Sequence, residues 1–386
     1  MSSEFSIDDL LHDEAIRTIV CCGSGGVGKT TTSAAIAIRA AEQGRRVAVL
    51  TIDPAKRLAQ AIGLEHLDNE PEPVTTIDAS AGGSLDAMML DMKRTFDEVV
   101  IRHAAPEKVQ QILDNPFYQA VSSSFAGTQE YMAMERLGQL MSETAADGEL
   151  RWDLVVVDTP PSRSALDFLD APERLGSFLD GRFIRLMTAP ARAGGRAYLK
   201  LMSVGVSSVT TVMSKILGAQ LLSDAQTFIA ALETMFGGFR ERADQTYALL
   251  KDPATAFVVV ATPERDALRE AAYFVDRLEE DGMPLAGLVV NRVQMTYVPS
   301  VNATRALNAA DAMDEVPDRS SGWRPTDTAA LLRLHADVTE LGVRHAEAID
   351  RFRLLHPQVP VGQVAAAGHD VNDIAELREI GEELAG

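Results

Sequence analysis

Five short runs of mainly apolar residues recur along the chain. They lie at residues 16–22, 47–53, 154–158, 256–262 and 287–293. The runs are continuous in Val, Ile and Leu rather than alternating with polar residues, which is typical of strands that are buried on both faces of a parallel sheet. A further short strand is expected near Val359–Val361. The pattern therefore predicts an α/β fold with a mostly parallel sheet flanked by helices.

Helical periodicity fills the intervals between these strands. A first helix is predicted across about residues 29–43, and Gly44 is expected to end it. Three longer helical stretches exceed the length of simple crossovers between strands, at approximately 88–150, 163–250 and 296–352. We interpret these three stretches as insertions that form a helical subdomain.

The whole chain, residues 1–386, is predicted to be a single domain. Within its last insertion, residues 310–328 are polar and rich in turn-forming residues, which predicts a loop. The core of the domain is predicted to comprise approximately residues 14–87, 151–162, 255–295 and 356–386.

Composition is that of an ordinary globular protein with a strongly acidic surface. Apolar residues make up 46%, charged residues 24%, and the net charge is −20. Such a surface repels phosphate backbones, so general nucleic-acid binding is not expected. The N-terminal segment is acidic and lacks the basic-then-apolar order of a secretion signal, so a cytoplasmic location is expected. Cys21 and Cys22 are adjacent within an apolar run, and we interpret them as core residues.

The segment 181–223 departs from this composition, because it contains six basic residues and no Asp or Glu. Leu201–Leu222 within it is long enough to cross a bilayer, but its many Ser, Thr and Gly residues disfavour a membrane span. Ten of the 14 methionines lie between Met88 and Met235. Met suits apolar surfaces that accept varied partners, although gap-filling in a helical core explains each residue somewhat better.

A glycine-rich motif follows the first strand. Residues Gly23–Thr30 read GSGGVGKT and fit the pattern G-x-x-x-x-G-K-[ST] between a strand and a helix. Glycines let the backbone wrap around phosphate oxygens with its N–H groups inward, and the following helix adds its positive dipole end. Lys29 is expected to reach the β- and γ-phosphates, and the Thr30 hydroxyl to bind Mg²⁺. The motif predicts a site for ATP with Mg²⁺ as its cofactor.

The same stretch also contains the spacing of a dinucleotide-binding turn. Gly23-x-Gly25-x-x-Gly28 has that spacing, and Asp53 ends the next strand, where such folds place an acid for the ribose. However, a dinucleotide site needs no lysine directly after the third glycine, whereas a γ-phosphate site does. Lys29 therefore favours a triphosphate over a dinucleotide.

Two carboxylates stand at the ends of predicted strands. Asp158 closes the run LVVVD and is expected to hold Mg²⁺ directly or through water. Asp53 closes the second strand, and Pro54 follows it. Two strand-end carboxylates beside one phosphate loop can divide the chemistry, one near the metal and one orienting or deprotonating the attacking water.

These motifs, in this order, resemble those of the ArsA-type ATPases, which include the arsenite-pump ATPase and the ATPase that escorts tail-anchored membrane proteins. The likeness extends over most of the chain and looks strongest to the paired actinobacterial members. It rests on Gly25-Gly26-Val27-Gly28-Lys29-Thr30-Thr31, Asp53-Pro54-Ala55, Asp158-Thr159-Pro160-Pro161, Thr262-Pro263-Glu264 and Asn291.

The resemblance implies a P-loop ATPase of the deviant Walker A type, with ATP at the interface of a dimer. Nucleotide contacts would come from Gly25–Thr31 and, at the adenine, from Asn291. Mg²⁺ would be held at Thr30 and Asp158, while Lys29 and Asp53 would be catalytic, Asp53 by acting on the attacking water. The helical insertions would bind a client, either an apolar protein segment or a lipid-like molecule, or else a dedicated partner protein. Both a homodimer and a heterodimer with a second family member stay open.

This chain also departs from the family pattern. Ser24 stands where the family usually has a lysine that reaches the partner subunit's nucleotide, and loss of such a cation can slow hydrolysis by orders of magnitude. We therefore expect a self-dimer to hydrolyse ATP slowly and a family member that carries the lysine to complete the site. Ser162-Arg163 replaces a frequent Gly-His pair. The cysteine motifs for zinc and arsenite are absent, so neither ligand is expected.

Three functions are consistent with these features. The first is an ATPase whose nucleotide cycle opens and closes a surface that binds a client or partner. The second is a scaffold subunit that binds nucleotide with little hydrolysis, which Ser24 favours. The third is an ATPase that positions itself on membrane or DNA; the acidic C-terminal stretch disfavours it, and segment 181–223 is the candidate for peripheral membrane contact.

Overall fold

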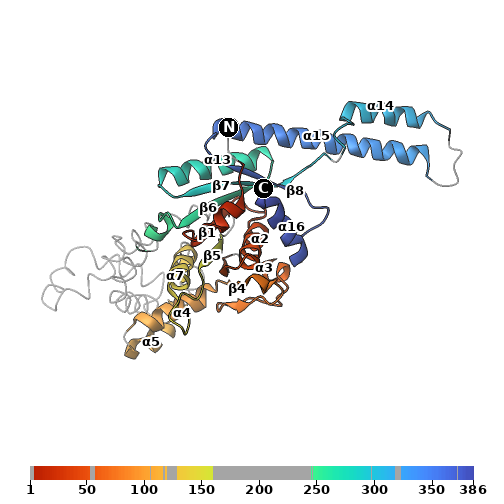
Figure 1. Ribbon diagram of the computed structural model, residues 1–386. Helices are drawn as coiled ribbons and strands as arrows, with labels where there is room; N and C mark the ends of the chain where they lie inside the picture. Colours follow the sequence, from red (N-terminus) through yellow and green to blue (C-terminus); the bar gives the residue numbers. More distant parts are fainter. Residues whose placement is uncertain are drawn as a thin grey trace, which may run out of the picture.

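The fold is an α/β sandwich built around one sheet (Figure 1). The computed structural model describes residues 4–52, 57–104, 106–115, 118–119, 128–159, 245, 247–296, 298–317, 323–371 and 373–386. Within these residues, eight strands form the sheet in the order β3-β4-β2-β5-β1-β6-β7-β8. The strands are β1 Thr18–Gly23, β2 Arg46–Thr51, β3 Glu72–Pro73, β4 Ser84–Met89, β5 Leu154–Asp158, β6 Thr255–Ala261, β7 Leu285–Val293 and β8 Val361–Ala365.

The sheet is parallel at every pairing of these strands except that of β3 with β4. β1 lies at its centre, between β5 and β6, and all six of its residues are buried. The mostly parallel sheet predicted from the continuous apolar runs is therefore confirmed. Because the carboxyl ends of parallel strands meet at one edge, the last residues of β1, β2 and β5 come together there.

Helices cover both faces of the sheet. One face packs against α1 Ile7–Leu11, α2 Lys29–Glu42, α3 Arg57–Ala61 and α16 Ile374–Ala385, and the other against α4 Met92–His103, α7 Thr128–Ser142 and α13 Arg265–Glu280. Successive strand residues point to opposite faces, so Cys21 and Cys22 lie in different cores. Both cysteines are buried, as predicted, and burial raises the pKa of each thiol to about 12.

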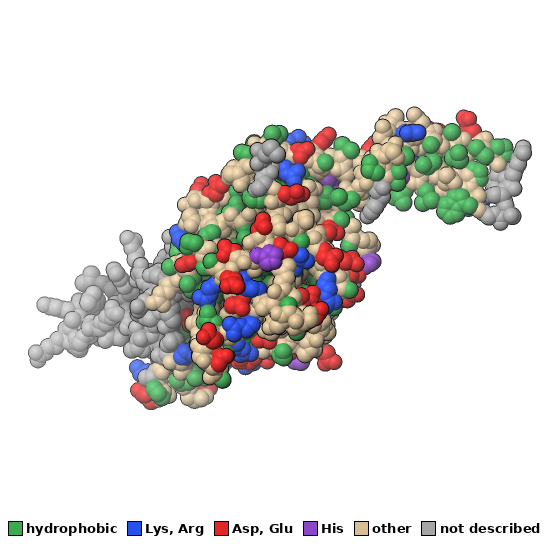
Figure 2. All heavy atoms as spheres, viewed as in Figure 1, with side chains coloured by type: hydrophobic (Ala, Val, Ile, Leu, Met, Phe, Trp, Pro, Cys, Tyr) green, Lys and Arg blue, Asp and Glu red, His purple; other side chains and the backbone are tan. Residues whose placement is uncertain are grey.

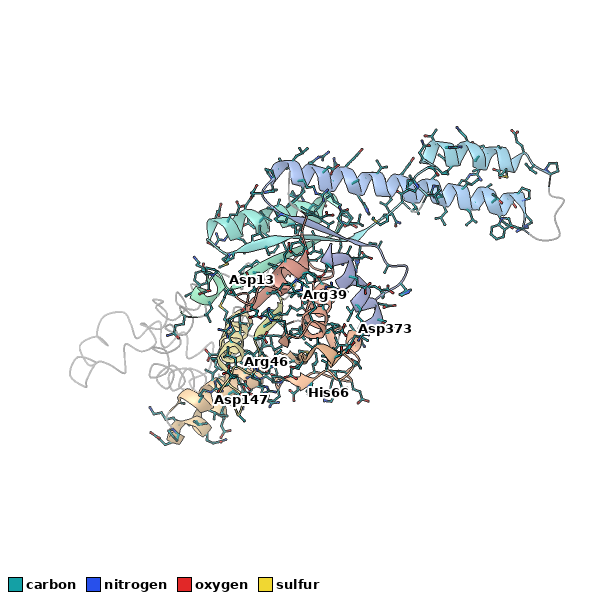
Figure 3. All side chains as sticks on the ribbon, in the orientation of Figure 1. Asp13, Arg39, Arg46, His66, Asp147 and Asp373 are labelled. Carbon is teal, nitrogen blue, oxygen red and sulfur yellow. The ribbon has the colours of Figure 1, made fainter. Side chains whose placement is uncertain are left out.

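An ion pair and a hydrogen bond connect the helices on one face of the sheet. Arg39 of α2, labelled in Figure 3, pairs with Asp8 of α1 through two hydrogen bonds of 2.6 and 2.7 Å. The hydrogen bonds from the Arg39 guanidinium hold the pKa of Asp8 below its usual value. The Ser6 hydroxyl donates to the Ala385 carbonyl at 2.6 Å, so the N-terminal segment is tied to the end of α16.

β5 has the predicted boundaries, those of the other predicted strands differ by up to four residues, and one strand pair was not predicted. β4 and the short β3 extend the sheet beyond β2, with β4 paired to β2 along its whole length. β4 reads SLDAMM, whose Ser and Asp interrupt the apolar run. The predicted first helix is confirmed as α2.

The three predicted insertions differ in how much of each is described. Residues 88–150 contain α4, α7 and α5 Pro106–Leu113. Most of 163–250 lies outside the described residues, and so do the segments 181–223 and Leu201–Leu222. The division of the chain into a core and insertions stays a prediction. In the part of the chain that is described, no helix has the length and apolarity needed to cross a membrane.

The last insertion forms a helical arm, which we define as α14 Ala303–Asp314 and α15 Pro325–Leu355. The outer part of α15 and the whole of α14 extend away from the sheet (Figure 1). The two helices pack through small residues, since Ala306, Ala310, Ala329 and Ala336 are almost fully buried. Arg333 strengthens the contact by binding Asp311 and Asp314.

The predicted loop at 310–328 is too long. α14 continues to Asp314, and α15 begins at Pro325. Proline suits the first turn of a helix because the N–H that it lacks has no helical partner there. The backbone N–H of Arg324 also donates to Oδ2 of Asp327 at 3.2 Å, and the Arg324 guanidinium donates to the same carboxylate, so Asp327 caps this end of α15. These start signals place four residues of the predicted loop inside the helix.

Candidate nucleotide site

The glycine-rich loop connects the central strand to the helix on its face. β1 ends at Gly23 and α2 begins at Lys29. Gly26 and Gly28 have φ angles of 77° and 99°, a left-handed conformation that side chains rarely adopt. A Cβ atom on Gly28 would lie 2.1 Å from Nδ2 of Asn291. The loop thus needs glycine at Gly28 for both backbone angle and space.

Lys29 turns back over the loop that precedes it. Its Nζ donates hydrogen bonds to the carbonyls of Gly23 and Ser24 at 3.0 and 2.8 Å, and its side chain is buried. The first N–H groups of α2 have no partner within the helix and face the same region. An ammonium and a helix N-terminus therefore lie together at the loop, which is the arrangement that binds phosphate.

Asp158 lies beneath the loop and receives two hydroxyl groups. Thr30 Oγ1 donates to Asp158 Oδ2 at 2.7 Å, and Thr51 Oγ1 donates to the same oxygen at 2.8 Å. Thr51 and Asp158 are register partners at the ends of the adjacent parallel strands β2 and β5. The contact between Thr30 and Asp158 brings together two residues predicted to share a metal, whereas Thr51 was missed. Thr51 could have been found from its place at the end of the neighbouring strand.

The donor set at this point fits Mg²⁺. Asp158 supplies carboxylate oxygen and Thr30 supplies hydroxyl oxygen, the hard ligands that Mg²⁺ prefers alongside waters and phosphate oxygens. Asp158 is fully buried, and a buried carboxylate is stabilised by a cation as well as by hydrogen bonds. The two residues are therefore a chemically suitable pair for one magnesium ion next to a bound phosphate.

Asn291 lies on β7, two residues before the strand ends, and also contacts the loop. Its Nδ2 donates to the Val27 carbonyl at 2.9 Å, and its Oδ1 accepts from the N–H of Arg292 at 2.9 Å. Arg292 has a φ of 61°, and the register between β7 and β8 shifts between Val290 and Val293. The irregular end of β7 thus directs the Asn291 amide to the phosphate loop.

The same strand end is connected to the arm. The N–H of Gln294 donates to Nδ1 of His345 at 3.1 Å, and His345 is a buried residue of α15. Burial lowers the pKa of His345, which favours the neutral ring that can accept this bond. Gly342 lies one turn earlier, and a Cβ there would be 2.9 Å from the Gln294 carbonyl. Asn291, which contacts the loop, and Gln294, which contacts the part of α15 nearest the sheet, are therefore only three positions apart in the chain.

A further contact reaches the loop from α13. Ser24 is buried, and its hydroxyl donates to Oε2 of Glu270 at 2.5 Å. No sequence pattern indicated this pair, because the two residues are 246 positions apart and Glu270 lies on the exposed face of an ordinary amphipathic helix.

The other predicted site residues are partly described. Gly25 and Gly26 are exposed at the tip of the loop, Val27 is buried, and Thr31 lies on the first turn of α2. Thr159 donates its hydroxyl to the Cys21 carbonyl at 2.8 Å and so ties the end of β5 to β1. Asp53, Pro54, Ala55, Pro160, Pro161, Ser162 and Arg163 lie outside the described residues.

Comparison with known proteins shows that the chain is similar to a family of ATPases. The sequence pattern of the family described as Anion-transporting ATPase matches residues 16–315. The ATPase ARSA2 of Chlamydomonas reinhardtii is 25% identical over 97% of this chain and 94% of its own length. The ATPase GET3 of Malassezia globosa is 24% identical over 80% of this chain and 82% of its own. The Arsenical pump-driving ATPase of Acidiphilium multivorum is 27% identical over 80% of this chain and 45% of its own length.

Proposed function

This chain belongs to the anion-transporting ATPase family, and we propose that it is a Mg²⁺-dependent ATPase whose nucleotide state controls how its arm binds a partner. The observation that carries the catalytic part is the convergence of Thr30 and Thr51 on Asp158, beside the loop that ends in Lys29. This arrangement combines a phosphate cradle with oxygen ligands for a cation at the carboxyl ends of β1, β2 and β5.

Each residue has a distinct role in the proposed reaction. Lys29 would leave the carbonyls of Gly23 and Ser24 and neutralise the β- and γ-phosphates of ATP. Thr30 and Asp158 would hold Mg²⁺, which when bound offsets the charge of the phosphates. Asp53, which follows Ile52 in the sequence, would orient the attacking water, as the family resemblance implies. Asn291 would contact the adenine.

The link between the site and the arm supports nucleotide control. Asn291 bonds to the loop at Val27, and Gln294, three residues later, bonds to His345 of α15. A nucleotide that displaces the Asn291 amide from Val27 would move the end of β7. Because Gln294 is hydrogen-bonded to His345, that movement would reach the base of α15 directly.

The exposed face of α15 is suited to binding a partner. Leu331, Leu334 and Leu341 are 51%, 57% and 36% exposed. Together with Val338, which lies between Leu334 and Leu341, they follow one another at intervals of three, four and three residues. This spacing puts all four on one face of the helix, opposite the buried Ala329 and Ala336. Hydrophobic side chains are visible over the surface of the arm (Figure 2). An apolar helix is the partner that such a stripe would accept.

The proposed assembly is a dimer, and Ser24 is the reason to expect two different chains in it. The family resemblance implies a lysine at this position, which reaches the nucleotide of the other subunit. Ser24 has a neutral hydroxyl instead, and this hydroxyl is hydrogen-bonded to Glu270. A dimer of this chain alone would therefore lack one cation at each site, and we expect slow turnover. A second family member that carries the lysine would complete the site of this chain.

Steady-state hydrolysis by the purified chain tests the catalytic proposal. Mg²⁺-dependent phosphate release is expected to be lost in Lys29→Ala and Asp158→Asn. Lys108→Ala removes the same type of side chain from α5 and should match the wild type. Hydrolysis that survives Lys29→Ala would contradict the assignment of this site.

Substitution of Ser24 by lysine tests the proposal of a missing cation. Ser24→Lys should raise turnover of the isolated chain by on the order of tenfold or more, because arginine and lysine cations that reach a transferred phosphoryl group have effects of at least that size. Ser24→Met has a side chain of similar reach without charge and should give no such gain. Equal rates in the two variants would show that the lysine is not what limits this chain.

A scaffold subunit with little hydrolysis is the second candidate, and the Ser24–Glu270 contact favours it. ATP-dependent assembly with a partner that persists without phosphate release would select this function over the first. The remaining idea, an ATPase that positions itself on membrane or DNA, depends on segment 181–223, which lies outside the described residues.

A further inference from the structure

The carboxylate of Glu270, a residue outside the phosphate loop, is hydrogen-bonded to that loop. Glu270 is an exposed residue on the second turn of α13, and its Oε2 accepts the Ser24 hydroxyl at 2.5 Å. The carbonyl of the same Ser24 accepts a hydrogen bond from Nζ of Lys29 at 2.8 Å. Ser24 therefore contacts both an anion and the cation that would bind phosphate.

We propose that Glu270, held in place by Ser24, is a specificity-determining residue that weakens nucleotide binding and does so more for ATP than for ADP. The inference rests on the proposed nucleotide site and assigns Glu270 a role within it. The group that this site would bind is the polyphosphate of a nucleoside di- or triphosphate.

The physical reason is the repulsion between fixed charges of the same sign. ATP carries one more negative charge than ADP, and that charge is on the γ-phosphate, which Lys29 is expected to reach. A carboxylate that is hydrogen-bonded to Ser24, the residue whose carbonyl Lys29 contacts, repels this group and offsets part of the attraction of the ammonium. The penalty is therefore larger for ATP than for ADP.

The bond to Ser24 is what keeps the charge near the loop. A glutamate on the exposed face of a helix normally turns its carboxylate into water, where solvent screens it. Hydrogen bonds to an ionised acceptor are among the stronger ones, so the bond from Ser24 favours the position of the carboxylate beside the loop. Loss of the Ser24 hydroxyl should release the carboxylate without removing its charge.

Calorimetric titration with Mg²⁺ and either ADP or a non-hydrolysable ATP analogue tests the inference. Glu270→Gln keeps a carbonyl that can accept the Ser24 hydroxyl and removes the charge. It should tighten binding of the ATP analogue by about 3- to 10-fold and that of ADP by a smaller factor, as expected for one partly screened charge. Ser24→Ala should give a smaller gain than Glu270→Gln, and adding it to Glu270→Gln should give none.

The matched control is Glu280→Gln. It removes the same charge from the same helix, ten residues and about 15 Å farther along α13. The control should leave the ratio of ATP to ADP affinity unchanged. The gain in Glu270→Gln should also shrink at high salt, a response that a merely structural role of this side chain would not produce.

Two results would count against the inference in different ways. Saturable binding with an affinity ratio that is the same in Glu270→Gln and Glu280→Gln would overturn the role of Glu270 alone. An absence of saturable nucleotide binding to the wild-type chain would contradict the proposed function itself, and with it the inference.

Discussion

The carboxyl end of the sheet and the arm bury their residues in opposite ways. At the sheet, Gly23, Thr51 and Asp158 end strands that are buried on both faces, and each has a specific partner across the site. The arm buries small alanines between two helices and leaves leucines on its outer face. The first region allows few substitutions, because backbone angles and hydrogen bonds fix each residue. The second allows many, as long as the two helices can pack and the outer face stays apolar.

The largest difference is expected when a leucine is truncated in each region. Leu50 of β2 is fully buried, and Leu334 of α15 is 57% exposed. Leu50→Ala should lower the free energy of unfolding by about 2–5 kcal/mol, because it leaves a cavity in the core. Leu334→Ala should change it by less than about 0.5 kcal/mol. Urea unfolding measures both values.

The same pair of variants separates stability from partner binding. Leu334→Ala should weaken capture of an apolar helical partner, whereas Leu50→Ala, in the fraction that stays folded, should not. A large loss of stability in Leu334→Ala would mean that the outer face of α15 is packed against the rest of the chain, and the contrast between the two regions would fail.

A smaller effect is expected from alanine at two glycines with positive φ. Gly28 has a φ of 99°, and a Cβ there would lie 2.1 Å from Asn291 Nδ2, whereas Gly282 has a φ of 67° and open space within 4 Å of its Cβ position. Gly282→Ala should cost about 1 kcal/mol of stability from backbone strain alone. Gly28→Ala should add a collision and weaken ATP binding by about tenfold or more.

Nucleotide titration and thermal unfolding of both glycine variants measure this difference. Equal ATP affinity in Gly28→Ala and Gly282→Ala would show that the loop can move Asn291 aside without cost. The site would then tolerate more substitutions than we infer from its comparison with the arm.

The smallest effect is a dependence of the arm on pH through His345. Burial lowers the pKa of this ring in the folded chain, so the unfolded chain binds more protons as the pH falls below the usual histidine value of about 6.5. Stability that comes from neutral His345 is therefore complete at neutral pH and is lost as the pH falls below that value. Hydrogen exchange at Gln294, followed from about pH 7.5 to about pH 5.5 and corrected for the intrinsic rate, should show increasing exposure at the low end.

The control for this effect is His345→Asn, whose side-chain oxygen can accept a hydrogen bond but does not titrate. This variant should remove the pH dependence at Gln294 while leaving that of the remaining chain unchanged. A pH dependence at Gln294 that persists in His345→Asn would contradict its assignment to His345.

Much of the site could be predicted from sequence because its parts are local or follow from strand order. The loop needs consecutive glycines, Lys29 and Thr30 close together in the chain, and the apolar run before Asp158 ends at the same edge of the sheet as β1. The contacts of Ser24 with Glu270 and of Asn291 with Val27 could not be predicted. They join residues that are 246 and 264 positions apart, and no periodicity of apolar residues in the sequence indicates such a pairing.

The fold was predictable to a similar degree. The central strands are continuous apolar runs, so their parallel arrangement followed from burial on both faces. β4 was missed because Ser84 and Asp86 interrupt its apolar run, and Asp86 accepts the indole N–H of Trp152 at 2.9 Å. The arm was expected to be helical, but its extension away from the sheet depends on the path of α15, which helical periodicity alone does not specify.

Control of the arm requires that nucleotide at the loop change the contact between β7 and α15. Amide hydrogen exchange with and without Mg²⁺ and ATP, in the wild type and in Lys29→Ala, measures this coupling. We predict that ATP changes exchange in peptides covering Asn291–Thr296 and Gly342–Phe352 of the wild type and leaves both unchanged in Lys29→Ala. ATP that binds to the wild type and protects the loop, but leaves both of these peptides unchanged, would contradict the proposed coupling.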